Sequence, residues 1–166
     1  MVGIPDAIRA LAELSPVEDL MLAILRDGLP GINVQSLIED DQTFPLVTVR
    51  RDPSFGGNTA DPRFTDAASV VVMTLVSDPD GDEDSAILSE VVRVLLRNAW
   101  LDHRVIAGRG HIIRIDLTSP PRRVADWATS SGPVQYADLP TGIWRYQATY
   151  SLEIRKPATN PFPATP

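Results

Sequence analysis

The sequence contains no cysteine, and this absence excludes several kinds of chemistry. Among its 166 residues no side chain can form a disulfide, a thiolate metal site or a cysteine nucleophile. A chain of this length needs no covalent staple, because a domain of about 150 residues buries roughly 70% of the surface that its unfolded form exposes. We therefore predict one domain held together by a hydrophobic core.

Positive charge and long apolar runs are also scarce. The 15 lysine and arginine residues are outnumbered by 22 acidic residues, which gives a formal charge of -7. This balance disfavours the basic patch that non-specific nucleic-acid binding needs. The N-terminal segment lacks a basic region, and no apolar run is long enough to span a bilayer. We expect a protein that is not exported and has no membrane partner.

Motifs for catalysis are missing as well. The two histidines, His103 and His111, stand on either side of a glycine-rich turn, beyond the spacing of two metal ligands on one helical face. The sequence GRG at 108–110 precedes a predicted strand, whereas a phosphate-binding loop follows a strand and opens a helix. Neither a nucleophile elbow nor a zinc-protease motif occurs. The sequence therefore predicts no catalytic residue, cofactor or metal, and indicates a protein that is not an enzyme.

The most charged stretch is SDPDGDED at 77–84, which we name the acidic turn. An EF-hand loop beginning at Asp78 needs glycine at its sixth position and glutamate at its twelfth, but Gly81 is the fourth residue and Ser89 is the twelfth. Apolar residues at helical spacing follow from residue 86 to residue 99. We interpret the acids as the start of a helix, where the helix dipole favours negative charge. A weak cation site is the alternative.

The remaining elements predict an α+β fold. A first helix is predicted over residues 16–27, because Ser15 is a suitable N-cap and Gly28 a suitable end. Strands are predicted at 32–38, 44–51, 67–77, 111–118 and 142–156. The last of these alternates apolar and polar residues with a period of two, which is typical of an antiparallel sheet with one buried face and one polar face.

The predicted domain covers residues 1–156. It consists of a single, mostly antiparallel β-sheet with two main helices packed on one face. The proline-rich segment KPATNPFPATP closes the chain, and residues 157–166 are predicted to be a disordered tail.

Two long connections interrupt the predicted elements. Residues 52–66 and 119–142 exceed the usual connection of about 4–6 residues, and such lengths indicate function or disorder. The connections and their borders carry residue types that are enriched at protein interfaces. These candidate interaction residues are Arg51, Phe55, Arg63, Phe64, Arg122, Arg123, Trp127 and Tyr136. The alternative is that the aromatic rings fold back onto their own domain.

Three stretches carry a resemblance to a known family. They are the opening VEDLMLAILRDGLPGINV, a strand that runs through the acidic turn into the helix DSAILSEVVRVLL, and the closing strand WRYQATYSLEIR. These stretches and the order of elements resemble those of the small tail terminator proteins of long-tailed bacteriophages with non-contractile tails, the lambda-type family. The resemblance covers roughly residues 15–156, and the segment 119–142 is its unmatched part.

This resemblance implies a structural virion protein that forms a homo-oligomeric ring, a hexamer, at the head-proximal end of the tail. The ring would be assembled in the host cytoplasm and would bind the last ring of the tail tube protein and then the head-tail connector protein. DNA would pass through the ring without specific binding. An acidic chain suits such a conduit, because a basic lumen would hold the genome as it passed.

Three other functions stay open on the sequence. A head-completion or neck connector protein of the same phage class shares the size, the acidity and the fold class. A peptide-binding module would use a free sheet edge for strand addition. A metal-dependent hydrolase would draw its ligands and bases from Asp78, Asp80, Asp82, Asp84, His103 and His111.

Overall fold

The computed structural model describes residues 17–38, 42–52, 65–124 and 142–155. In these ranges the chain forms a five-stranded sheet and two helices, α2 (Val17–Gly28) and α3 (Gly81–Leu101). The strands are β1 (Asn33–Gln35), β2 (Leu46–Arg51), β3 (Thr65–Ser77), β4 (His111–Arg123) and β5 (Ile143–Arg155). The predicted tail 157–166 lies outside the described residues and stays a prediction.

The sheet is mixed and has the strand order β1-β2-β3-β5-β4. The short strand β1 runs parallel to β2, and the other three neighbouring pairs are antiparallel. Strands β3 and β5 pair over their whole length, from Thr65 opposite Arg155 to Ser77 opposite Ile143. The predicted α+β class and the mostly antiparallel sheet are confirmed.

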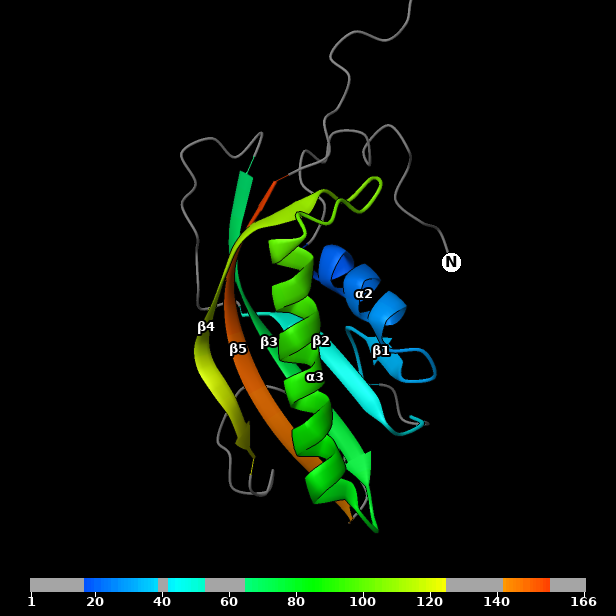
Figure 1. The fold of residues 1–166 in the computed structure, drawn as a ribbon. Helices are drawn as coiled ribbons and strands as arrows, with labels where there is room; N and C mark the ends of the chain where they lie inside the picture. Colours follow the sequence, from blue (N-terminus) through cyan, green and yellow to red (C-terminus); the bar gives the residue numbers. More distant parts are fainter. Residues whose placement is uncertain (1–16, 39–41, 53–64, 125–141, 156–166) are drawn as a thin grey trace, which may run out of the picture.

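Both helices lie on the same face of the sheet, as predicted (Figure 1). Helix α3 contacts β3, β4 and β5, whereas α2 lies over β1 and β2 and also contacts α3. The main core therefore forms between the two helices and the inner face of the sheet. Its fully buried members include Leu20 and Leu25 from α2, Leu96 from α3, and Tyr150 and Leu152 from β5.

The opposite face of the sheet is not uniformly polar, and the prediction of one polar face is wrong for the centre of the sheet. Leu46, Met73 and Leu75 form a second buried cluster there, with Phe44 and Ile143 packed against it. The reason lies in β3, whose sequence VVVMTLV has apolar residues at both parities of a period-two pattern. A strand of this kind buries side chains on both sides of the sheet.

Strand β4 is longer than predicted. It continues through Pro120 and Pro121 to Arg123, so residues 119–123 are strand and do not belong to a loop. A proline cannot donate to a strand ladder, which is why the sequence suggests a break. The described part of the sheet has β4 at its edge, where prolines are tolerated, and the pairing with β5 accommodates them through register shifts on either side of Ser119.

Helix α3 begins at Gly81, so the acids of the acidic turn form the start of a helix, as predicted. Asp82, Glu83 and Asp84 lie in its first turn, but the N-cap Asp80 makes no capping bond through its side chain. Two acids hold the start of the helix to β5. Trp144 donates its indole N–H to Asp78. The Tyr146 hydroxyl donates to Asp82 at 3.3 Å.

We expect the acids of this turn to differ in their effect on stability. Asp80→Asn should change the free energy of unfolding by less than about 0.5 kcal/mol, since its carboxylate makes no cap bond. Asp82→Asn should cost about 1 kcal/mol, because it weakens the bond from Tyr146 and the attraction of Arg123, whose guanidinium lies 3.6 Å away. Urea denaturation measures both values. Equal losses would show that the contact with Tyr146 does not hold the helix start.

Candidate functional site

The sequence-predicted interaction residues do not gather into one described surface. Arg51 ends β2, where its guanidinium lies 3.4 Å from Asp66. Arg122 and Arg123 end β4, and strands β3 and β5 separate them from β2. The other five candidates lie outside the described residues. These are Phe55, Arg63, Phe64, Trp127 and Tyr136.

Arg123 serves an intramolecular contact in this structure. Its guanidinium lies 4.0 Å from the centroid of the Trp144 ring and 3.6 Å from the Asp82 carboxylate. The Trp144 ring in turn packs against the start of α3 at Gly81. The end of β4 is thereby attached to β5 and to the first turn of α3. Stacking on an indole is a common role of arginine, and half of this side chain stays accessible.

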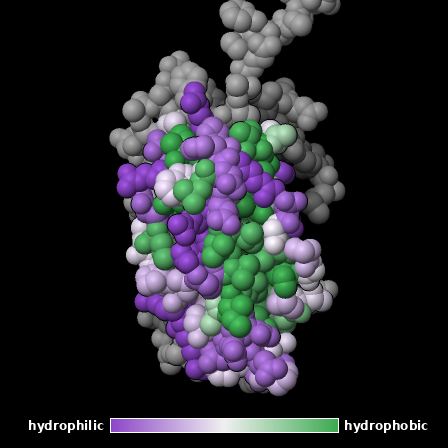
Figure 2. Space-filling model, in the orientation of Figure 1, coloured by the Kyte–Doolittle hydropathy of each residue, from purple (hydrophilic) through white to green (hydrophobic). Residues whose placement is uncertain are grey.

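An exposed row of apolar side chains runs along α3. It consists of Ile87, Val91, Val94 and Leu101, which are between 38% and 53% exposed. Their spacing places them on one side of the helix, away from the sheet. Figure 2 shows a hydrophobic patch on this face of the molecule, where α3 lies in Figure 1. We name this row the outer stripe.

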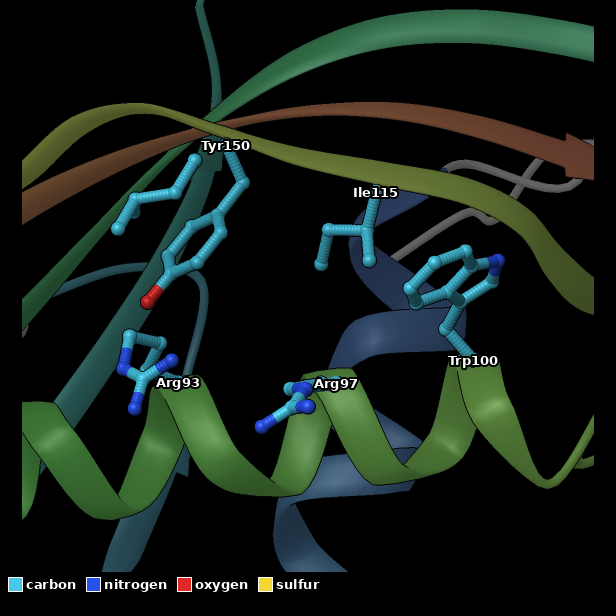
Figure 3. Close-up of a pocket in the computed structure, with 6 residues that line it drawn as sticks. Arg93, Arg97, Trp100, Ile115 and Tyr150 are labelled. Carbon is cyan, nitrogen blue, oxygen red and sulfur yellow. The ribbon is translucent and has the colours of Figure 1, made fainter.

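A cleft borders α3 on the side of β4. Its volume is about 150 Å³, and its lining comes from three elements (Figure 3). Arg93, Arg97 and Trp100 project from α3, Ile115 and Leu117 from β4, and Tyr150 from β5. The Trp100 indole N–H donates to the carbonyl of Ile113 at 2.7 Å, which fixes the ring beside β4. We name this site the α3–β4 cleft.

The Tyr150 hydroxyl is the unusual group of the cleft. It is buried, points toward Arg93, and has no hydrogen-bond partner in the described part of the protein (Figure 3). Burial raises the pKa of Tyr150 to about 12, against a smaller lowering by the Arg93 charge. At neutral pH the group is therefore a neutral phenol with an O–H to donate. A buried donor without a partner costs free energy, so the Tyr150 hydroxyl would gain from an acceptor in the cleft.

The two arginines of the cleft differ in their partners. Arg93 forms a bidentate ion pair with Glu90, one turn earlier on the helix surface. Arg97 is exposed and makes no hydrogen bond or ion pair with any residue that the structure describes. The cleft therefore combines a phenol donor and an available guanidinium above apolar walls. This combination suits an anionic group on a short apolar stem.

A family model described as phage tail termination protein matches residues 13–161. The chain belongs to this family. The match includes both helices and all five strands of the structure. A comparison with curated proteins gave no match.

The side chains that the hydrolase alternative requires are far apart in this tail termination protein. Asp78 and Asp80 precede α3 and Asp82 and Asp84 lie in its first turn, whereas His103 and His111 follow its C-terminal end. A helix of 21 residues is roughly 30 Å long. The acids and the histidines therefore lie at opposite ends of α3 (Figure 1). They do not form the single centre that this alternative needs.

None of the described helices combines the length and the apolar character that a membrane span requires.

The sequence interpretation missed both the outer stripe and the α3–β4 cleft. The stripe could have been found in the sequence. Apolar residues cover about half of the α3 helical wheel, whereas a helix that packs on one sheet face needs a narrower apolar arc. The cleft had no such signal. Tyr150 has the pattern of a core residue on an alternating strand, and Arg93 and Arg97 have the pattern of a solvated helix face.

Proposed function

We propose that this tail termination protein acts as a homo-oligomeric ring, a hexamer, that caps the tail tube and joins it to the head connector. The observation that carries the proposal is the outer stripe. Exposed apolar patches rimmed by polar residues often mark interaction surfaces. Family membership makes a tail-assembly partner the natural occupant, and neighbouring copies of the chain are the nearest candidates.

Strand addition at the sheet edge fits the structure less well. Strand β4 lies at the edge of the described sheet, but it contains Pro120 and Pro121 and its pairing with β5 shifts register three times. Prolines and irregular registers are devices that keep an edge from pairing with another strand. A peptide-binding module would therefore find a poor template here, whereas the surface of α3 is regular and apolar.

The proposal assigns the protein a structural role without catalysis. The ring is assembled in the host cytoplasm, occupies the head-proximal end of the tail and lets DNA pass without specific binding. The formal charge of -7 agrees with that passage, because an acidic wall does not retain a polyanion. Phe55, Arg63, Phe64, Trp127 and Tyr136 are proposed as contacts with the tail tube protein or the connector protein. Arg51, Arg122 and Arg123 are the exposed candidates on the described strands.

The ring can be tested by a double substitution in the outer stripe. We expect the purified wild-type protein to form rings with a central hole in negative stain and a hexameric mass by light scattering. Val91→Asp with Val94→Asp should give a folded monomer, because two charges would be desolvated in the contact. Val105→Asp is the matched control, since Val105 is 67% exposed and lies outside the stripe. A double variant that assembles like the wild type would contradict the proposal.

The same variant tests the role in the virion. Expressed in place of the native protein, the Val91→Asp, Val94→Asp variant should give headless tails of abnormal length beside filled capsids. Normal tails beside empty or leaking heads would instead favour a head-completion or connector protein. Normal virions would show that the outer stripe is needed neither for tail termination nor for head completion.

A further inference from the structure

We infer that the α3–β4 cleft receives a carboxylate from the first turn of α3 of a second copy of this chain. The inference rests on the ring proposed above and names the two surface patches that meet between neighbouring subunits. The α3–β4 cleft lies on the side of α3 next to the outer stripe. One continuous surface would therefore contain the apolar contact of the stripe and the polar contact of the cleft. Val94 of the stripe and Arg97 of the cleft are neighbours on the helix, three positions apart.

The chemistry of the cleft selects a carboxylate. The Tyr150 hydroxyl and the Arg97 guanidinium are both donors, and carboxylate oxygens accept from groups of either kind. Bonds between a guanidinium and a carboxylate are charge-assisted and stronger than neutral ones. A volume of about 150 Å³ holds one side chain and is below the roughly 300–1,000 Å³ of pockets for drug-sized ligands. The walls of Trp100 and Ile115 would pack against the apolar stem of that side chain.

The acids that could supply this group are found at the start of α3. Asp80, Glu83 and Asp84 are exposed, and their side chains make no hydrogen bond or ion pair with the residues that the structure describes. Asp78 and Asp82 of the same turn are already bound to β5. The described residues thus include three available acids at the start of α3 and an available guanidinium in the cleft. This charge complementarity favours a copy of the same chain as the occupant.

The positions of the two patches fit a ring. Arg97 lies about four helical turns beyond Glu83, which is roughly 20 Å along α3. The cleft and the acidic first turn are therefore distinct surfaces of one subunit. A contact between two different patches is heterologous, and repeated around a rotation axis it closes into a ring.

Charge reversal tests the contact with the full chain. The cleft variant is Arg97→Glu, and the turn variant combines Glu83→Lys with Asp84→Lys. Each variant alone should raise the dissociation constant of the subunit contact at least tenfold, measured by sedimentation velocity. A mixture of the two variants in equal amounts should assemble again. Subunits of the two kinds can alternate, so that every cleft faces a first turn of opposite charge. Arg109→Glu changes an exposed arginine outside the cleft and should assemble like the wild type.

The outcomes separate this inference from the proposed ring. If the wild type, the cleft variant alone and the turn variant alone all form rings, the proposed contact is wrong and the proposal of a ring stands. Loss of assembly without recovery in the mixture would also overturn it, since the two patches would not be partners. A wild type that is monomeric at every concentration would overturn both proposals.

Removal of the Tyr150 hydroxyl is a second, independent test. Tyr150→Phe should raise the dissociation constant roughly tenfold, as expected for one hydrogen bond to a charged group. The melting temperature of the dissociated subunit should not fall, because the hydroxyl has no partner there. A lower melting temperature with unchanged assembly would overturn the assignment of this hydroxyl to the contact.

Discussion

Replacement of Leu152 by alanine is expected to lower the free energy of unfolding by roughly 2–5 kcal/mol. Leu152 is 2% exposed and lies on β5, between β3 and β4. Its side chain belongs to the main core beneath the two helices. Truncation removes apolar contacts and leaves a cavity that the surrounding strands cannot fill by local movement, because β5 is paired on both sides.

The control for this substitution is Thr149→Ala on the same strand. Thr149 points to the other face of the sheet and is only half-buried, and the bond that it accepts from Thr118 goes to its backbone carbonyl. We expect a loss below about 1 kcal/mol. Urea denaturation of both variants, with similar m-values, gives the comparison. Equal losses would show that β5 is buried equally on its two faces at this point.

The fold class could be predicted because β5 and α2 carry unambiguous patterns. Strand β5 alternates strictly over its length, and its inward residues Ala148, Tyr150, Leu152 and Ile154 are all buried. Helix α2 is bounded in the sequence by Ser15 and Gly28, and the structure ends the helix at Gly28. Local signals of this kind depend little on distant parts of the chain.

The extent of β4 and the two-sided burial of β3 could not be predicted in the same way. Whether Pro120 and Pro121 end a strand depends on its position in the sheet, since only an edge strand accepts them. Likewise, β3 is an apolar run in the sequence, and only the packing of Phe44, which precedes β2, and of Leu46, which begins it, shows what covers the second face of β3. Both properties are tertiary, and a single sequence does not contain them.

The surfaces of α3 show the same limit for the candidate site. Its apolar arc covers about half of the helical wheel, and α2 packs against α3 where Leu95 lies close to Gly28. Val91 and Val94 are left exposed. The α3–β4 cleft is distinguished by the Tyr150 hydroxyl, which has no hydrogen-bond partner among the described residues. No sequence pattern predicts such a property.

The glycine of the acidic turn gives the last prediction. A Cβ at Gly81 would lie 2.3 Å from Cδ1 of Trp144 and 2.9 Å from the carbonyl oxygen of Val76. The Trp144 ring cannot move away freely, because its N–H is bonded to Asp78 and Arg123 stacks on it. Gly81→Ala is therefore expected to lower the free energy of unfolding by about 1–3 kcal/mol. Alanine would by itself favour the helix by up to about 1 kcal/mol, so a loss identifies the steric contact.

Gly28 provides the matched control at the end of α2. A Cβ there would lie 2.7 Å from the two terminal methyl groups of Leu95, which can rotate away. Gly28→Ala should therefore change the free energy of unfolding by less than about 1 kcal/mol. In a Trp144→Leu background the cost of Gly81→Ala should fall, because a smaller and more flexible side chain replaces the ring. A cost that is the same in both backgrounds would show that the indole is not what requires glycine at the start of α3.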